Sequence, residues 1–515
     1  MNSPEQLARV IEDFLAQGTP VVVEDGAVAF DFAHARYSLS SDHGKCVLHL
    51  WSAERNSVRR VLDAEITGHG STLRLSTLRF GQTKPVKMEF WRDRERRSGA
   101  QCRAARQAYQ QRLRALLERC FSEWTIERLT CQMDLKHSFS SVYTRGLLKQ
   151  GSRASALLGV GGDESQAAVD GALTFGLLWL DYCRQAQAAR CHVEGLKMLV
   201  PPGRSALVRE RMAHLNPAVA KWQLFEYNER EGTLGPVDTA DRGNVETRLA
   251  HCPDSHSLEE RFAASLRRVR QRLPQVEIHA LSSAEIAFRW RGLEFARARM
   301  EPAAGTFQLA EQIRFGIGPR ETVLTEANSA EFDELISVIA ATRRPEGDRT
   351  QSLWRATPER WLESVVIENL TALDDRFDPE CIYSQVPAFA ASDRAVIDVL
   401  ARTRDGRLAV IELKADEDIH LPLQAVDYWA RVEWHRTRGE FERHAYFAGR
   451  PFSPQPAMLL LVAPALRVHP ATDTLLRYLS PEIDLTLLGI DERWREQLRV
   501  VFRKRPQKTC GTSDF

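Results

Sequence analysis

The sequence predicts an α/β fold, and its clearest part is a mixed sheet flanked by helices near the C-terminal end. Two short apolar runs, residues 396–400 and 408–413, are separated by Asp405-Gly406, a pair typical of a tight hairpin turn. A helical segment follows at residues 421–436, and strand, helix and strand then alternate to about residue 491. This alternation favours strands packed beneath helices over an all-helical or all-strand protein.

Composition excludes several classes of protein. The chain has 515 residues, of which 43% are hydrophobic, so it can form several modules with cores of their own. No apolar run is long enough to span a membrane, and the first residues lack the basic and apolar regions of a signal peptide. The nine cysteines form no Cys-x-x-Cys pair, which favours reduced thiols over zinc sites or disulfides. We therefore expect a cytoplasmic protein without a membrane partner.

Changes in pattern divide the chain into four expected modules. Residues 1–93 are rich in strand patterns after a first helix, and residues 94–245 begin with an arginine-dense helix and continue as α/β. Residues 246–345 have the pattern of helices and a hairpin in an α+β module. The polar stretch Arg343–Ser352 is the clearest linker, and residues 353–506 form the C-terminal α/β module.

The net charge of the chain indicates less about its function than the pattern of apolar residues does. The formal net charge is only +1 at pH 7, so the chain as a whole has no strong attraction for a polyanion. Arginines concentrate in the helix expected after residue 93, where interleaved glutamate and glutamine favour a solvated face over a surface that follows phosphates. Any binding to nucleic acid must therefore rely on local patches.

Three polar side chains interrupt the two apolar strands of the C-terminal module. Asp398 lies in the first strand, and Glu412 and Lys414 lie at the end of the second. Because side chains of a strand alternate between its faces, Glu412 and Lys414 share one face. Burying unpaired charge is costly, and two adjacent carboxylates suit a hard cation such as Mg²⁺ or Mn²⁺. The pattern predicts such a metal site, with Lys414 placed to offset charge on a bound phosphate.

Two predicted helices add polar side chains to the same module. Thr357-Pro358 is typical of a helix start, and the acids further along this helix are Glu363 and Glu368. The pattern does not decide which of these two faces the strands. Gln424 and Tyr428 lie four residues apart on the helix after the second strand, so they share one face and point the same way.

These features resemble the PD-(D/E)xK phosphodiesterase superfamily, and RecB-like and NucS-like endonucleases in particular. The shared order is a helix glutamate, a strand aspartate, a hairpin, a strand that ends Glu-x-Lys and a helix with Gln-x-x-x-Tyr. The resemblance covers residues from about 355 to 505. It implies a restriction-endonuclease-like core and Mg²⁺- or Mn²⁺-dependent hydrolysis of phosphodiester bonds, most often in DNA. It assigns the metal to Asp398, Glu412 and Glu363, catalysis to these three with Lys414, and the hold on the substrate strand to Gln424 and Tyr428.

Other functions remain open at this stage. The fold could be kept by a catalytically idle protein that acts as a nucleic-acid-binding or scaffold module. The metal site could also belong to an enzyme that is not a nuclease, or to a hydrolase of RNA. The sequence identifies neither the preferred substrate nor the oligomeric state. DNA repair and defence against foreign DNA are equally open.

The middle of the chain repeats the pattern of the C-terminal module. When residues 126–245 are laid on that module, Gly159 falls under Glu412. Arg145 precedes Gly159 by the spacing that separates Asp398 from Glu412. We therefore consider a tandem duplication in which the first nuclease-like unit has degenerated. The alternative is that any two α/β modules share such a pattern.

Overall fold

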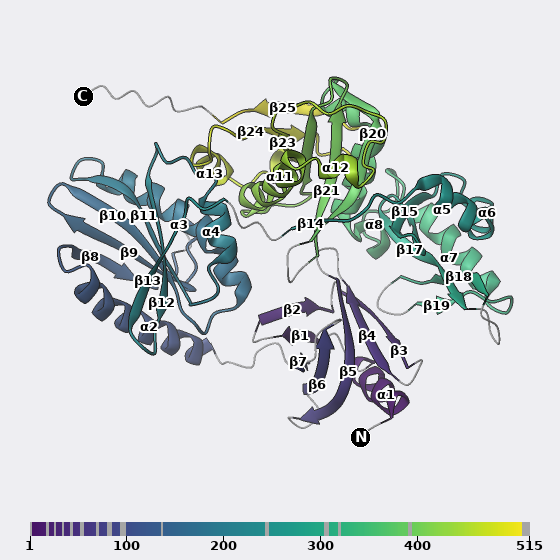
Figure 1. Ribbon diagram of the computed structural model, residues 1–515, viewed down its shortest axis with the longest axis horizontal. Coiled ribbons are helices and arrows are strands. Elements are labelled where there is room, and N and C mark those ends of the chain that lie inside the picture. The colour runs from purple at the N-terminus through teal and green to yellow at the C-terminus, as the bar shows by residue number, and fades with distance from the viewer. Residues whose placement is uncertain are drawn as a thin grey trace.

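The structure is a computed structural model of the chain (Figure 1). It describes residues 3–506 apart from 17–19, 25–26, 33–34, 42–44, 52–55, 68–71, 80–84, 93–98, 135–136, 243–246, 303–307, 318–320 and 390–393. The described strands belong to four sheets, each covered by helices. The expectation of a mixed α/β chain is confirmed. Among the described residues, no helix is long and apolar enough to cross a membrane.

The N-terminal module, residues 4–91, is an antiparallel sheet of seven strands with one helix against it. The helix α1 (Pro4–Leu15) begins with a capping box, in which the side chains of Ser3 and Gln6 each bond the other's backbone nitrogen. The strand order is β2-β1-β7-β6-β5-β4-β3. The strands are β1 (Val21–Glu24), β2 (Ala27–Asp31), β3 (Arg36–Ser40), β4 (Cys46–Trp51), β5 (Asn56–Thr67), β6 (Thr72–Arg79) and β7 (Val86–Trp91).

The middle unit, residues 99–237, is a mixed sheet in the order β13-β12-β11-β10-β9-β8. Strands β10, β11 and β12 are parallel, and the other neighbours are antiparallel. Helix α2 packs on one face, and α3 and α4 pack on the other. The strands are β8 (Thr125–Thr130), β9 (Tyr143–Gln150), β10 (Arg153–Val160), β11 (His192–Val200), β12 (Lys221–Asn228) and β13 (Thr233–Val237). The helices are α2 (Gly99–Cys120), α3 (Gln166–Gln187) and α4 (Ala206–Met212).

The C-terminal unit, residues 352–504, contains a second mixed sheet, to which β14 adds an edge strand from earlier in the chain, in the order β14-β20-β21-β22-β23-β24-β25. Here β22, β23 and β24 are parallel and their outer neighbours are antiparallel. The strands are β14 (Arg248–Leu249), β20 (Phe377–Phe389), β21 (Arg394–Thr403), β22 (Leu408–Leu413), β23 (Met458–Pro464), β24 (Asp484–Ile490) and β25 (Val500–Lys504). The helices are α8 (Ser352–Arg355), α9 (Pro358–Glu368), α10 (Leu370–Leu373), α11 (Leu421–Thr437), α12 (Glu440–Arg443) and α13 (Thr472–Arg477), with a 3₁₀ turn η3 (Ala465–Arg467).

The hairpin module, residues 255–342, lies between the middle and C-terminal units in the sequence. Its antiparallel strands pair in chain order, from β15 to β19. The strands are β15 (Glu277–Ser282), β16 (Glu285–Trp290), β17 (Leu293–Pro302), β18 (Leu309–Phe315) and β19 (Thr322–Val323). The helices are α5 (Ser255–Arg261), α6 (Ala263–Arg270) and α7 (Ser329–Thr342).

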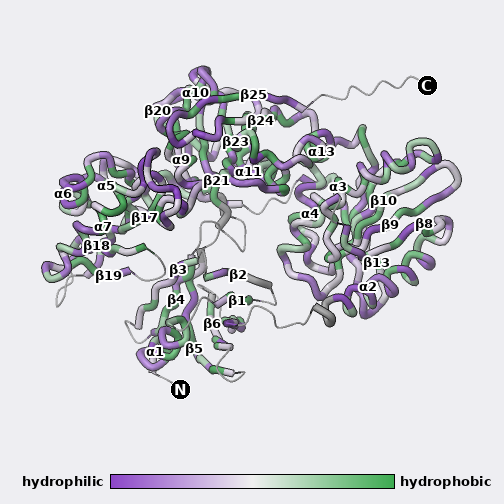
Figure 2. The backbone as a smooth tube through the Cα atoms, turned by 180° about the vertical axis from the view of Figure 1, so that it is seen from behind, coloured by the Kyte–Doolittle hydropathy of each residue, from purple (hydrophilic) through white to green (hydrophobic). Residues whose placement is uncertain are grey.

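One hydrophobic core runs from the middle unit into the C-terminal unit. It joins Leu173 and Leu180 of α3 to Val426 of α11 and Leu475 of α13. A second core lies on the opposite face of the C-terminal sheet, where α9 packs. The central strands are buried on both faces and are therefore apolar along their length, as the tube of β23 shows in Figure 2.

The stretch that the sequence identifies as a linker is largely exposed, but its first residue, Arg343, is packed into the structure. The Arg343 side chain is fully buried, and its guanidinium donates to the carbonyl oxygens of Leu353 and Ala356 at 2.7 Å and of Arg291 at 2.6 Å. The guanidinium also lies 4.6 Å from the ring centre of Trp361. Composition marks this segment as polar, but Arg343 uses its charge to tie α7 to the start of the C-terminal unit.

The hairpin of β16 and β17 presses on the first turn of α9. A Cβ atom added to Gly292 would lie 2.0 Å from the carbonyl oxygen of Arg360. Ser364 of α9 donates to Glu277 at 2.6 Å, and Glu277 also accepts from the Gly292 nitrogen. Helix α9 begins at Pro358 as expected, but Thr357 is in the left-handed region and its side chain makes no capping bond. The hairpin therefore contributes to holding the start of this helix.

His214, which follows helix α4, gives a testable dependence of stability on pH. Burial and, after it, the charge of Arg242 lower the pKa of His214 to about 4, against the effects of Asp427 and Glu482. The unfolded chain protonates this histidine near pH 6.5. Stability is therefore complete above that pH and falls as the pH drops toward 4, by about 2 kcal/mol for this partly exposed group.

The measurement is the urea midpoint of unfolding between pH 4 and 7 for the natural chain and for His214→Gln. The variant should lose less stability over this range. His256→Gln is the matched control, because the His256 side chain is 81% exposed. Equal acid losses in the natural chain and His214→Gln would show that another group is responsible.

Candidate active site

The predicted strand residues lie at the end of the hairpin formed by β21 and β22. Val399 pairs with Ile411 in this antiparallel ladder, and the next position along it places Asp398 opposite Glu412. The backbone nitrogen of Leu413 donates to Asp398 Oδ2 at 3.1 Å. Lys414 directly follows β22, and its backbone nitrogen donates to the Val462 carbonyl oxygen. Two carboxylates from adjacent strands thus lie beside the same lysine.

Glu412 is a buried carboxylate with one oxygen left without a protein partner. Glu412 is only 1% exposed to solvent. Lys414 Nζ lies 3.4 Å from Oε1, but Oε2 has no hydrogen-bond partner among the described residues. Burial raises the pKa of Glu412 well above its usual range, and the carboxylate of Asp398 raises it further. Ionising both carboxyls would therefore place more negative charge here than the surrounding protein neutralises.

Lys414 is held in its charged form. Burial would lower the pKa of this lysine, but the carboxylates of Glu412, Glu359 and Asp398 raise it above its usual range. Asp418 lies 4.0 Å away across the following loop. A permanently charged ammonium can bind anionic oxygen or orient water, and it is poorly suited to remove a proton.

Of the two helix acids, Glu363 faces the strands. Arg360 donates to Glu363 Oε2 at 2.7 Å and to Asp398 Oδ1 at 3.3 Å, so one guanidinium joins the helix acid to the strand acid. Gln385 donates to the same Glu363 oxygen at 2.7 Å. Burial raises the pKa of Glu363 to about 8, against the effect of Arg360. Glu368 instead interacts with Glu277 and Arg291 of the hairpin module.

Gln424 and Tyr428 lie together on α11. Gln424 Nε2 donates to the Tyr428 hydroxyl at 3.3 Å, as their spacing predicts for one helix face. Burial raises the pKa of Tyr428, and Glu412 and Asp398 raise it further, which places the phenol beside the carboxylates. Tyr428 therefore lies close to the two acids, with Gln424 one turn before it.

Sequence reasoning missed three residues around these carboxylates. Arg360 lies three positions before Glu363, so helical spacing could have identified it. Glu359 lies one turn before Glu363 and acts on both Glu412 and Lys414. Gln385 comes from β20, and no short-range pattern links it to Glu363.

The acids do not form a preassembled cluster of three metal ligands. In the part of the chain that the structure describes, no three His, Cys, Asp or Glu side chains converge in that way. Arg360 lies between the helix acid and the strand acid. The arrangement brings together Asp398, Glu412 and Lys414, with Glu363 attached through Arg360.

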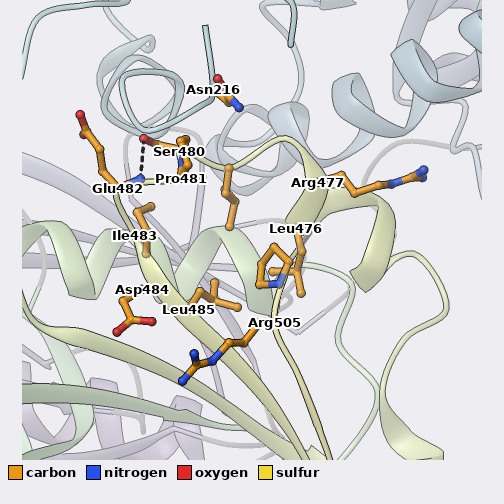
Figure 3. A pocket seen from close by; sticks show the side chains of 12 residues that line it. Asn216, Leu476, Arg477, Ser480, Pro481, Glu482, Ile483, Asp484, Leu485 and Arg505 are labelled. Atoms are coloured by element: carbon orange, nitrogen blue, oxygen red, sulfur yellow. Dashed lines mark hydrogen bonds between the residues drawn. The ribbon is translucent and has the colours of Figure 1, made fainter. Parts of the chain in front are cut away.

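A pocket of about 500 Å³ lies elsewhere, where the middle and C-terminal units meet (Figure 3). Asn216 comes from the middle unit, and most of the lining comes from the stretch that runs from the end of α13 to the start of β24. The guanidinium groups of Arg477 and Arg505 are accompanied by the carboxylates of Glu482 and Asp484. None of the predicted site residues lines this pocket, so it does not add to the site.

Comparisons with known proteins give little support for a family. No protein-family profile matches the chain, and no curated protein matches it. Among solved structures, the chain matches a repair endonuclease from Pyrococcus abyssi at 10% sequence identity. The match covers 41% of this chain and 92% of that chain, with a TM-score of 0.16. A TM-score this low supports no conclusion about fold or function.

Proposed function

We propose that this chain is a nuclease that hydrolyses phosphodiester bonds in DNA and depends on Mg²⁺ or Mn²⁺. The observation that carries the proposal is the pair of carboxylates, Asp398 within β21 and Glu412 opposite it in β22, with Lys414 beside them. Polar groups that interrupt buried strands need a compensating function, because burying them is costly. The resemblance to PD-(D/E)xK nucleases gives that function its chemistry.

The residues present fit a small divalent cation. Mg²⁺ keeps several waters and commonly binds through only one or two protein carboxylates, here Asp398 and Glu412. The unpartnered oxygen of Glu412 offers a ligand that the protein itself does not satisfy. A bound cation would also offset the repulsion between Asp398 and Glu412, which contributes to raising the pKa of Glu412.

Hydrolysis joins a water oxygen to phosphorus and breaks one phosphorus–oxygen ester bond. The water gives up a proton and the departing oxygen takes one up, so the products are an alcohol and a phosphate monoester. A bound divalent cation supplies polarisation of the phosphate and a more acidic water. In this proposal Lys414 holds the attacking water and offsets the charge that grows on phosphorus. Gln424 and Tyr428 hold the substrate strand, and Glu363 orients the metal's surroundings.

A gel assay tests this function and its alternatives. The purified chain is incubated with single-stranded, duplex, flapped and mismatched DNA, and with RNA of the same sequence, in Mg²⁺, Mn²⁺ or EDTA. We expect cleavage of DNA only with a divalent cation. Cleavage of RNA alone would make the chain a hydrolase of RNA. Binding of DNA without cleavage under any condition would favour the idle binding protein and overturn the proposal.

Replacing Arg360 should change how tightly the cation binds. Its guanidinium holds an oxygen of Asp398, so a cation must compete with it for that carboxylate. We expect Arg360→Gln to bind Mn²⁺ roughly tenfold more tightly, since one charged hydrogen bond no longer opposes binding. Without metal, the variant should unfold at a lower temperature, because Glu363 loses its cation. Calorimetric titration with Mn²⁺ and thermal unfolding in EDTA measure the two effects.

Arg355→Gln is the matched control for this prediction. Arg355 is exposed, ends α8, and donates to the carbonyl of Arg349 instead of to a carboxylate. It should leave Mn²⁺ affinity unchanged. Weaker Mn²⁺ binding by Arg360→Gln would show that Arg360 does not compete with the cation for Asp398. It would indicate instead that Arg360 stabilises the metal-bound protein.

A further inference from the structure

The middle unit has the same topology as the C-terminal unit. Strands β8 to β13 correspond in order and direction to β20 to β25, with the same parallel trio at the centre. The helices occupy matching connections, because α3 and α11 follow the central hairpins and α4 and α13 precede the last parallel strands. Topology therefore supports a comparison strand by strand.

Register identifies the positions that match the two strand acids. Gly159 pairs with Leu199 in the parallel ladder, as Glu412 pairs with Leu461. In the antiparallel ladder Gly159 faces Thr144. The match for Asp398 is therefore Thr144, and the sequence spacing that points to Arg145 is wrong. The two hairpin loops differ in length, so spacing does not carry over from one unit to the other.

Tyr109 fills the space that the acids occupy in the C-terminal unit. A Cβ atom on Gly159 would lie 2.6 Å from the Tyr109 hydroxyl, and one on Gly161 would contact the same ring at 3.4 Å. Tyr109 comes from α2 and is 4% exposed, with no hydrogen-bond partner for its hydroxyl among the described residues. No carboxylate fits at Gly159, and Thr144 stands where the C-terminal unit has Asp398, so the middle unit lacks both strand acids.

The two units pack against each other in a reciprocal way. The segments that follow α4 and α13 lie antiparallel, with Leu215 opposite Leu479. The Asn216 nitrogen donates to the Tyr478 carbonyl, and the Ser480 nitrogen donates to the His214 carbonyl, both at 2.8 Å. Each segment thus gives one hydrogen bond and receives one, as two copies do across a two-fold axis.

The neighbouring helices repeat this reciprocity. Helix α3 contacts α13, and α11 contacts α4. Arg211 of α4 lies 2.7 Å from Asp427 of α11, and Arg477 of α13 lies 3.4 Å from Asp181 of α3. In each case an aspartate on a long helix meets an arginine on the short helix of the other unit. The paired faces are buried in the shared core, so a second chain cannot use them.

We propose that the middle unit is a catalytically silent counterpart of the C-terminal unit, paired with it as a dimer within one chain. The chain therefore has one set of acids where a true dimer has two, and it nicks one strand of a duplex. The two strands of a duplex are antiparallel, and a symmetric pair of sites is needed to reach both in one encounter. This inference rests on the proposed nuclease function.

Light scattering and a plasmid assay test the inference. We expect the mass of one chain, 58.4 kDa, in solution. With Mg²⁺, supercoiled plasmid should accumulate as nicked circle at a rate proportional to protein concentration, and linear DNA should appear only later. Tyr109→Phe should nick as the natural chain does, since Tyr109 only fills space, whereas Lys414→Met should nick far more slowly.

Three results would overturn the inference, and they are distinguishable from failure of the nuclease function. Linear DNA formed without a nicked intermediate would show two coordinated cuts and leave the nuclease function standing. A two-chain mass with a rate that rises as the square of concentration would show pairing between chains. Loss of nicking in Tyr109→Phe would give the middle unit a part in the chemistry. No cleavage by the natural chain would remove the nuclease function and this inference together.

Discussion

Lys414→Met should slow cleavage by about a hundredfold or more while the chain remains folded. The ammonium of Lys414 is held charged by Glu412, Glu359 and Asp398, and no other cation contacts Glu412 in the described structure. Removing a charged group that stabilises a developing anion costs about a hundredfold to a thousandfold in rate. Methionine keeps most of the aliphatic volume, and the buried carboxyl of Glu412 can take up a proton in its place. The single-turnover rate with Mg²⁺ measures the effect.

Lys504→Met is the matched control for this variant. Lys504 lies on β25 of the same sheet, its side chain is 51% exposed, and it pairs with Asp473 at the surface. It should cleave as the natural chain does. Circular dichroism of both variants should be that of the natural chain. Cleavage by Lys414→Met at the rate of the natural chain would show that Lys414 takes no part in catalysis.

Gly292→Ala should cause a large loss of stability. Gly292 has a φ of +72°, so alanine there costs about 1 kcal/mol for the backbone. Its Cβ would also lie 2.0 Å from the carbonyl oxygen of Arg360, so the hairpin or α9 must shift. We expect a total loss of about 3 kcal/mol or more. Trp290 and Trp361 flank this contact, so tryptophan fluorescence during urea unfolding reports on it.

Gly151→Ala separates the cost of the backbone conformation from the cost of the steric contact. Gly151 has a φ of +59° in the turn between β9 and β10, but nothing lies within 4 Å of its added Cβ. It should lose only the backbone share, about 1 kcal/mol. Because α9 carries Arg360 and Glu363, Gly292→Ala should also cleave DNA more slowly than Gly151→Ala. Equal losses of stability in the two variants would show that the hairpin does not press on α9.

Local signals predicted the hairpin and the helices around the site. Asp405-Gly406 marks the turn between β21 and β22, where Gly406 has a φ of +92°. The start of α9 at Pro358 and the shared face of Gln424 and Tyr428 also follow from residues close in sequence. These features depend on backbone preferences and helical spacing, which a sequence carries directly.

Contacts between distant segments could not be predicted. Gln385 of β20 donates to Glu363 of α9, and Arg343 binds carbonyl oxygens in two other segments. The match of Thr144 to Asp398 depends on strand register, and the two hairpin loops differ in length. Gly159 has the appearance of a lost ligand in the sequence, but only packing reveals that Tyr109 takes its space. In each case the partner comes from a segment that no local pattern connects.

The most direct test of the central claim is the cleavage rate of duplex DNA as a function of Mg²⁺ concentration. It compares the natural chain with Glu412→Gln, which keeps the shape of the side chain but removes the charge of a proposed metal ligand. We expect the natural rate to rise with Mg²⁺ to a plateau and to vanish in EDTA. Glu412→Gln should show no cleavage at any Mg²⁺ concentration. Equal rates for the two proteins, or cleavage by the natural chain in EDTA, would contradict the account.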